Sequence, residues 1–145
     1  MEQEYHLIGK YNSILYRLSQ AFISAELKED AIGSGQYPFL LVLYQYDGIS
    51  QEELSNRLII DKGTTARAVS KLEAAGYVQR RSDPDDRRLN RVYLTQQGRD
   101  VRPKLYETLG KWSEVMLKDL SQDEQEFLLH TLHKVVISIQ KQNRE

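Results

Sequence analysis

The sequence of 145 residues contains no cysteine. This absence excludes disulfides, thiolate metal sites and any sensor that responds to peroxide through a thiol. No apolar run approaches the roughly 20 residues that span a bilayer, so we expect no membrane segment. The first residues are acidic and lack an apolar stretch, which argues against a signal peptide. These features predict a cytoplasmic protein with one domain and a modest core.

The sequence also lacks the patterns of common catalytic and cofactor sites. It has no Ser-His-Asp order, no glycine-rich phosphate loop and no HExxH pattern. His130 and His133 lie three residues apart and could share a metal ion, but without cysteine or a third ligand nearby we expect them to be exposed on the last helix. We therefore expect no enzyme, no cofactor and no metal site.

A net charge of −1 by itself argues against a nucleic-acid partner, but the charges are unevenly distributed. The segment from Arg57 to Arg91 holds nine basic and five acidic residues, which is +4 locally and leaves −5 on the rest. A local positive patch is all that has to face phosphate. An ordinary solvated surface would show the same charge pattern, so charge alone leaves both interpretations open.

The two ends of the chain predict amphipathic helices. Apolar residues recur at spacings of three and four from residue 5 to residue 28, which predicts a long amphipathic helix. Gly33-Ser34-Gly35 then interrupts the helical pattern. Thr95 is positioned to cap a helix that continues to about Leu117 despite Gly98 and Pro103. Ser121 begins a capping box for the last helix. One stripe of that helix is apolar, with Leu128, Leu132, Val135, Val136 and Ile139.

The middle of the chain has the pattern of a helix-turn-helix followed by a hairpin. A short buried helix is predicted over Tyr37–Tyr46, then a turn at Asp47-Gly48, and Ser50 with Glu53 forms a capping box for a helix to about Leu58. Asp61 caps the next helix, which ends at Gly76. Strands are predicted over residues 77–82 and 90–94, joined by the turn Asp83-Pro84-Asp85-Asp86.

The helix that follows Asp61 has one buried and one small, polar, basic face. Thr65, Ala68, Val69 and Leu72 form the buried stripe. The face predicted to meet DNA consists of Lys62, Gly63, Thr64, Arg67, Ser70 and Lys71. Arg67 suits a bidentate contact to guanine, worth roughly 1–3 kcal/mol of base discrimination, whereas Lys71 suits phosphate. Gly63 would let the backbone approach the duplex. A solvated amphipathic helix is the alternative.

The hairpin has arginines beyond an acidic turn. We expect Arg87 and Arg88 to meet DNA at the wing. Three aspartates at such a tip would repel phosphate, and the expected resolution is that Asp86 pairs with Arg88 or a nearby arginine and orients its guanidinium. The aspartates could instead merely form the turn, above all Asp85.

These residues resemble the MarR family of winged helix-turn-helix transcription regulators, particularly its SlyA-like members. The resemblance is carried by Gly63-Thr64-Thr65-Ala66-Arg67, by Leu72-Glu73-Ala74-Ala75-Gly76-Tyr77-Val78, by Asp83-Pro84-Asp85-Asp86-Arg87-Arg88 and by Val92-Tyr93-Leu94-Thr95-Gln96-Gln97-Gly98. It implies that Asp86 orients the wing and that Arg88 enters the minor groove. The flanking helices match only as patterns. Several relatives carry a sensing cysteine near the N-terminus, which this chain lacks.

The resemblance implies a mainly helical fold with a small β-wing in a single domain, residues 1–145. A winged helix-turn-helix lobe over about 34–98 would lie between dimerisation helices over about 1–30 and 99–145. The terminal helices have more apolar surface than a lobe of about sixty residues can cover, which independently favours a homodimer over a monomer. Two recognition helices would then meet successive major grooves of a pseudo-palindrome.

The family also implies a small-molecule pocket where the dimer helices meet the winged lobe. Its candidate lining residues are Tyr11, Arg17, Tyr37 and Trp112, together with Tyr16, Tyr44 and Tyr106. Aromatic walls with one cation suit a phenolic or carboxylate effector, although aromatic residues at helical spacing more often belong to a core. The sequence as a whole predicts a ligand-responsive DNA-binding regulator, more often a repressor. The alternative is a winged-helix module that binds protein and not DNA.

Overall fold

The computed structural model describes residues 4–143 in two compact units, one ending at Gly110 and the other beginning at Lys111. The first residues of the acidic N-terminal segment and the outer ends of the two predicted dimerisation ranges lie outside the described residues. The boundary between the two units falls within one helix. Among residues 4–143, no helix combines the length and apolar character needed to cross a membrane.

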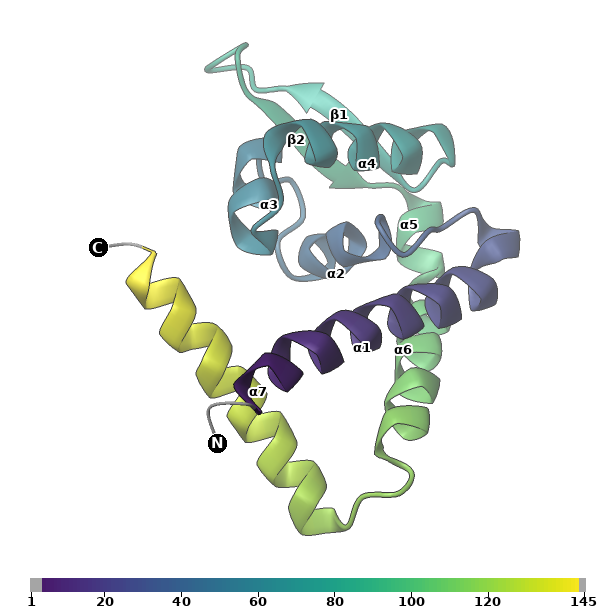
Figure 1. The fold of residues 1–145 in the computed structure, drawn as a ribbon. Helices are drawn as coiled ribbons and strands as arrows, with labels where there is room; N and C mark the ends of the chain where they lie inside the picture. The colour runs from purple at the N-terminus through teal and green to yellow at the C-terminus, as the bar shows by residue number, and fades with distance from the viewer. Residues whose placement is uncertain (1–3, 144–145) are drawn as a thin grey trace. The chain divides into compact units, whose positions relative to one another are not determined.

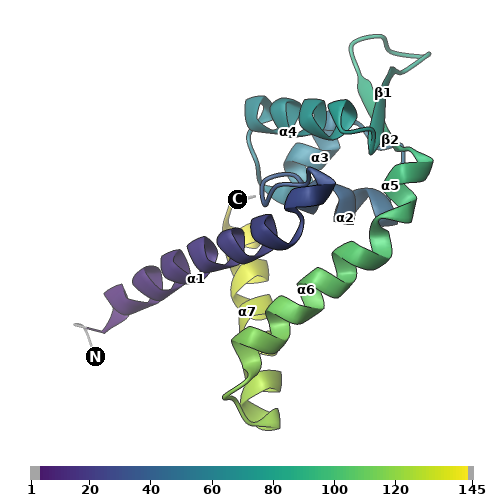
Figure 2. The same cartoon turned by 90° about the vertical axis from the view of Figure 1, so that its right-hand side faces the viewer.

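The first unit is helical with a two-stranded antiparallel sheet, which confirms the predicted fold class (Figure 1). Its elements follow the order α1 (Tyr5–Glu26), the 3-10 turn η1 (Lys28–Asp30), α2 (Tyr37–Gln45), α3 (Gln51–Leu58), α4 (Lys62–Ala74), β1 (Val78–Ser82), β2 (Asn90–Leu94), α5 (Gln96–Asp100) and the first part of α6 (Arg102–Leu117). Both views show the hairpin of β1 and β2 projecting beyond α4 (Figures 1 and 2).

The predicted caps position the helices of the lobe. The Ser50 hydroxyl accepts a hydrogen bond from the Glu53 amide, and the Asp61 carboxylate accepts one from the Thr64 amide. Gly76 has a φ of +87°, the left-handed conformation that a helix end favours and that glycine adopts without strain. The reciprocal bond from Ser50 N–H to Glu53, which a full capping box requires, is not made, so that part of the prediction was wrong. Ser50 lies opposite Arg91 of β2 in an isolated antiparallel bridge.

Two predicted helices are shorter than expected. The N-terminal helix ends at Glu26 rather than at residue 28, because the chain turns there to bring Leu27 and Ile32 into the core. The helix predicted from residue 95 to Leu117 is two helices, α5 and α6, with a break at Val101. Pro103 explains the break, since it has no N–H to donate to the carbonyl of Arg99 and its ring clashes with that carbonyl.

The core of the first unit lies between α2, the helix-turn-helix and the hairpin. Its fully buried side chains include Phe39, Leu40 and Leu43 of α2, Leu54 of α3, Val69 and Leu72 of α4, Val92 of β2 and Leu105 of α6. The end of α1 joins this core through Ile23 and Leu27. The strands pair from Val78 with Leu94 to Ser82 with Asn90. Backbone bonds between residues 48–49 and Val92 tie the start of α3 to the hairpin.

Ile59, between α3 and α4, has a left-handed backbone conformation that the sequence did not predict. Its φ is +55° and its ψ is +45°, and its amide donates to the carbonyl of Ser55. A β-branched residue rarely adopts this conformation, which costs it roughly 1–2 kcal/mol. Its side chain is 66% exposed, so little burial offsets that strain.

Replacing Ile59 by asparagine should therefore stabilise the protein. Asparagine tolerates the left-handed conformation, and we expect Ile59→Asn to raise the free energy of unfolding by about 1 kcal/mol. Urea denaturation followed by circular dichroism measures this change. Ile59→Val is the matched control, because valine is also β-branched and keeps the strain. Equal stability of the Asn and Val variants would contradict the assignment of strain to this residue.

Large apolar side chains of α1 from Tyr5 to Leu18 are exposed. Tyr5, Ile8, Tyr11, Leu15 and Leu18 are between 48% and 69% exposed, whereas Ile23 near the end of the same helix is buried. Within the first unit, α1 is therefore anchored by its C-terminal end. Its N-terminal half presents an exposed apolar face on which no other described element of the first unit packs.

The second unit consists of the end of α6 and of α7 (Gln122–Gln142). Ser121 makes both bonds of the predicted capping box: its hydroxyl accepts from the Glu124 amide and its amide donates to the Glu124 carboxylate. None of the residues of α7 is buried. The predicted apolar stripe of this helix, from Leu128 to Ile139, is exposed along its whole length.

Candidate nucleic-acid interface

Helix α4 has the two faces that the sequence predicts. Thr65, Ala68, Val69 and Leu72 are all buried. The hydroxyl of Ser55 in α3 donates to Thr65 at 2.9 Å, which fixes the two helices against each other. The opposite face, with Lys62, Gly63, Thr64, Arg67, Ser70 and Lys71, is exposed. A helix with this surface can enter a DNA groove because no bulky apolar side chain stands in the way.

The start of α4 contains a chain of hydrogen bonds. Asp61 accepts from the Thr64 amide at 2.8 Å and from the Thr64 hydroxyl at 2.7 Å. Arg67 Nη2 in turn donates to the Thr64 hydroxyl oxygen at 3.0 Å. The Thr64 hydroxyl and then its amide hold the pKa of Asp61 below its usual value, with a smaller contribution from Arg67. The carboxylate is therefore charged at neutral pH.

Ser70 contacts the hairpin through an arginine that sequence reasoning did not single out. Arg80 Nη2 donates to the Ser70 hydroxyl at 3.0 Å and to Glu73 Oε1 at 3.2 Å, and the Arg80 amide donates to Glu73 Oε2 at 2.8 Å. The hydrogen bond from the Arg80 backbone amide is the main reason why the pKa of Glu73 is lowered. The alternation of side chains along the strand could have predicted that Arg80 turns toward the lobe, since it lies on the same face as buried Val78.

The base of the wing depends on Asp83, whose side chain is only 9% exposed. It accepts from Arg91 Nε at 2.6 Å and from the amide of Asp85 at 2.8 Å. These two bonds, the first being the larger, lower the pKa of Asp83. Arg91 also donates to the Gly48 carbonyl at 3.1 Å. Through Arg91, Asp83 thus connects the hairpin to the loop before α3. Sequence reasoning had assigned Asp83 only to turn formation.

The tip of the wing presents the predicted arginines to solvent. Arg88 pairs with Asp86, with Nε 3.2 Å from Oδ1, and the Arg88 amide donates to the same oxygen at 3.0 Å. The predicted pairing of Asp86 with Arg88 is therefore present. The Arg88 side chain is 91% exposed, and Arg87 is exposed beside it. The Nε of this guanidinium is held by Asp86, and the exposed remainder of the group can contact a partner.

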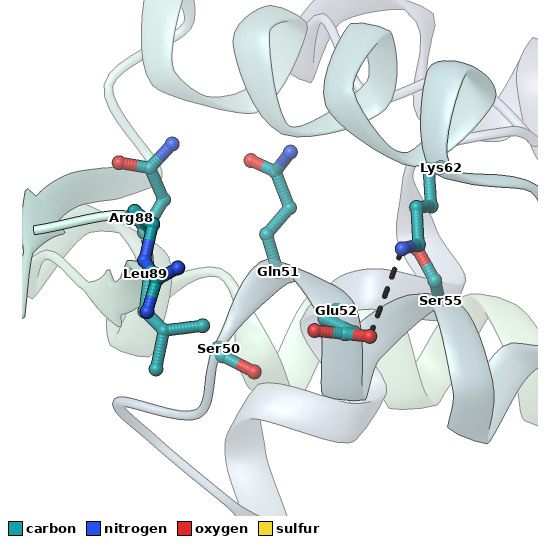
Figure 3. Close-up of a pocket in the computed structure, with 8 residues that line it drawn as sticks. Ser50, Gln51, Glu52, Ser55, Lys62, Arg88 and Leu89 are labelled. Carbon is teal, nitrogen blue, oxygen red and sulfur yellow. Dashed lines mark ion pairs between the residues drawn. The ribbon is translucent and has the colours of Figure 1, made fainter. Parts of the chain in front are cut away.

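A polar cleft of about 200 Å³ separates the wing from the start of α3 and α4 (Figure 3). It is lined by Ser50, Gln51, Glu52, Ser55, Lys62, Arg88, Leu89 and Asn90. In the close-up, Gln51 lies between the wing residues and Lys62, which forms an ion pair of 3.7 Å with Glu52. Arg88, predicted for the wing, and Lys62, predicted for the helix, therefore face one shared cleft.

The predicted ligand residues fall into different places. Tyr16 and Tyr37 line a pocket of about 300 Å³ in the first unit, with Ser19, Gln20, Ile23, Ser34, Gly35, Pro38, Leu58 and Ile60. Tyr11 and Arg17 are exposed on α1 and are not among the residues of this lining, and Arg17 donates to Ser13. Tyr44 and Tyr106 pack together at 6.2 Å near Arg102, and Trp112 belongs to the second unit.

Comparison with known proteins agrees with this geometry. The model of the MarR family matches residues 32–89, from the segment between η1 and α2 into the wing. The uncharacterized HTH-type transcriptional regulator YybA of Bacillus subtilis is 30% identical over 128 residues, which cover 88% of this chain and 85% of YybA. The chain belongs to the MarR family. Its regulators are DNA-binding transcription factors, and the chain shares that general function.

Solved structures of MarR proteins have the same fold. A MarR transcriptional regulator from Methanosarcina mazei Go1 superimposes with a TM-score of 0.90 at 41% identity, covering 94% of this chain and 98% of that one. The transcriptional regulator SlyA superimposes with a TM-score of 0.85 at 27% identity, covering 93% and 95%. The predicted resemblance to the MarR family and its SlyA-like members is thereby confirmed, and the similar proteins are regulators rather than enzymes.

Proposed function

We propose that the protein is a homodimeric cytoplasmic repressor that binds a pseudo-palindromic operator and responds to a small aromatic effector. The observation that supports the DNA-binding part is the exposed, small-residue, basic face of α4 beside the exposed Arg88 of the wing. In this proposal α4 enters the major groove, and the wing reaches the adjacent minor groove. A protein that occupies a promoter blocks the polymerase, which favours repression.

The residues of the two elements have different roles in this proposal. Arg67 contacts guanine, because its fork of donors matches the two acceptors that guanine presents in the major groove. Lys62 and Lys71 neutralise phosphates. Gly63, Thr64 and Ser70 form the part of the helix surface that lies against the duplex. On the wing, Asp86 orients Arg88 through the ion pair of 3.2 Å between them, and Arg87 adds charge beside it. Arg80 of the hairpin donates a hydrogen bond to Ser70 and so orients its hydroxyl.

The exposed apolar faces of the chain support the homodimer. The N-terminal half of α1 and the stripe of α7 expose large apolar side chains that water solvates poorly. A second copy of the chain offers the same faces, and closed twofold symmetry lets each copy cover the other. We propose that the helices outside the winged lobe, over about 1–30 and 99–145, form this interface, and that the lobe over about 34–98 binds DNA.

In-vitro selection of DNA by the purified full-length chain tests the DNA-binding part directly. Selection at two salt concentrations should enrich a pseudo-palindrome whose half-sites are about one helical turn apart, with a weaker yield at higher salt. A selection that enriches nothing above a neutral control protein would favour the alternative, a protein-interaction module. A single enriched half-site without symmetry would contradict the dimeric arrangement on DNA.

The pocket lined by Tyr16 and Tyr37 supports the effector part. Burial, and secondly Tyr16, raises the pKa of Tyr37, so its phenol remains protonated and can donate to a carboxylate. Gln20 donates to the Tyr16 hydroxyl at 2.7 Å, which orients a second polar group in the lining. Apolar walls from Ile23, Pro38 and Ile60 complete a surface suited to an aromatic acid.

We expect an aromatic carboxylate such as benzoate or a hydroxybenzoate to stabilise the protein. A ligand present at about 100 times its Kd contributes about 2.7 kcal/mol, which raises the Tm by roughly 5–10 °C in a protein of this size. Differential scanning fluorimetry measures this shift. Tyr37→Ala should remove it, whereas Tyr106→Ala, outside the pocket lining, should retain it. A series of aromatic acids without any shift, or a shift that Tyr37→Ala leaves intact, would contradict this pocket.

A further inference from the structure

Arg67, the residue proposed to contact a base, does not extend freely from α4. Its Nη2 donates to the Thr64 hydroxyl at 3.0 Å, and that hydroxyl donates to Asp61 Oδ2 at 2.7 Å. Asp61 Oδ1 accepts from the Thr64 amide at 2.8 Å. The side chains of Asp61, Thr64 and Arg67 therefore form a connected chain along one edge of the exposed face, within the first turn and a half of the helix.

The direction of these bonds depends on the charge of Asp61. An ionised carboxylate only accepts, so the single hydroxyl proton of Thr64 is directed toward Asp61. The lone pairs of the Thr64 oxygen are then free to accept from Arg67. The bonds from the Thr64 hydroxyl and amide lower the pKa of Asp61, whose carboxylate is charged at neutral pH. Arg67 uses one of its five N–H donors here, which leaves enough donors for a bidentate contact to guanine.

Gly63 lies beside the guanidinium and the carboxylate. A Cβ at this position would be 3.4 Å from Arg67 Nη1 and 3.4 Å from Asp61 Oδ1, which is ordinary van der Waals contact. Arg67 is therefore folded back toward the beginning of the helix, beside the acid that caps it.

We propose that Asp61 and Thr64 are positioning residues, which fix the guanidinium of Arg67 before DNA arrives and so determine how strongly α4 prefers one base pair. The inference rests on the proposed function, in which Arg67 contacts a base. Ordering a flexible side chain at an interface costs about 0.5–1.5 kcal/mol, which is roughly two- to twelvefold in affinity. Only the specific complex requires Arg67 in one orientation. The preorganisation therefore increases the preference for the operator over other DNA.

Three variants separate this role from simple helix capping. Thr64→Val removes the hydroxyl and retains the β-branched shape, and Thr64→Ser restores the hydroxyl. Asp61→Asn retains a good N-cap, since an asparagine oxygen still accepts from the Thr64 amide. It nevertheless lacks the second acceptor oxygen for the Thr64 hydroxyl. Asp85→Asn is the matched control, because it makes the same change of charge at an exposed wing position that does not contact Arg67.

The measurement is the ratio of affinities for the selected operator and for an operator altered at the base pair that Arg67→Ala relaxes. We expect Thr64→Val and Asp61→Asn to lower this ratio roughly two- to twelvefold. Thr64→Ser should restore the wild-type ratio that Thr64→Val loses, and Asp85→Asn should leave the ratio unchanged. Thermal unfolding should show that all variants fold. Asp85→Asn should share with Asp61→Asn only the increase in non-specific affinity that one lost negative charge produces.

The outcomes distinguish this inference from the proposed function. If Arg67→Ala relaxes one base pair while Thr64→Val and Asp61→Asn leave its ratio unchanged, Arg67 contacts a base and the positioning role is overturned. If Thr64→Ser lowers the ratio as much as Thr64→Val, the threonine methyl group rather than the hydroxyl is responsible, and the inference also fails. If Arg67→Ala leaves the selected sequence unchanged, the proposed base contact itself is wrong.

Discussion

The variant Leu132→Glu should convert the protein from a dimer to a monomer and abolish tight operator binding. Leu132 lies in the exposed stripe of α7, between Leu128 and Val136. Burying a leucine contributes roughly 1.5–3 kcal/mol, and a symmetric dimer loses two of them. The dimer dissociation constant should rise by at least about a hundredfold, before the additional cost of burying an unpaired carboxylate.

The loss of the dimer should also be visible on DNA. A dimer binds its second half-site at high effective concentration, and linkage of two sites can increase the affinity by about 10²–10⁴. We expect Leu132→Glu to bind a single half-site as weakly as the wild-type chain does, but to lose most of the gain that the full operator gives. Light scattering after size exclusion and a binding titration on both DNA molecules measure the two effects.

His133→Glu is the control for this experiment. It introduces the same negative charge at the next residue, which is turned by about 100° around the helix from Leu132. His133 is exposed and lies outside the apolar stripe. This variant should remain a dimer and should bind the full operator. A Leu132→Glu protein with dimer mass at micromolar concentration would show that the α7 stripe does not form the interface.

The variant Arg88→Ala should weaken binding to all DNA sequences alike. The Arg88 side chain is almost fully exposed at the wing tip and is oriented by Asp86. A cation that meets the phosphate-lined minor groove contributes counterion release rather than base readout. Its removal should therefore reduce the slope of log affinity against log salt by about one for each wing. The selected sequence in the major groove should not change.

Titration of the operator at four or more salt concentrations measures this slope. Arg99→Ala is the matched control, since Arg99 is an exposed arginine of α5 that pairs with Asp47 beyond the base of the hairpin. Its salt slope should equal that of the wild-type chain. A slope for Arg88→Ala that equals that of Arg99→Ala would remove the wing tip from the DNA interface. A changed selected sequence would instead assign base readout to Arg88.

The local pattern of the sequence was sufficient to predict the winged lobe. Asp61, Gly76 and Thr95 begin or end helices through bonds within four residues along the chain, so their roles follow from residue type and spacing. The same holds for the buried stripe of α4, because its helical period identifies the face turned toward the core. Local signals were less reliable where they compete, as at Pro103, which interrupts a helix that Thr95 begins.

The contacts between residues distant in sequence could not be predicted in this way. Arg91 joins Asp83 to the carbonyl of Gly48, and Arg80 joins Ser70 to the wing. Which arginine of a strand turns toward a helix depends on the register of the hairpin and on the packing of α4 against it. The left-handed Ile59 is a similar case, because its conformation is imposed by the two helices that the turn must join.

The sequence by itself determined that this chain has a helix-turn-helix, a helix with an exposed basic face and a wing, because capping, periodicity and turn chemistry act over a few residues. The tertiary structure decided how the charged groups on that face are paired and which apolar surfaces are left uncovered. Those properties depend on the distances between elements, and a hydrogen bond or a buried surface exists only when folding brings its two partners together.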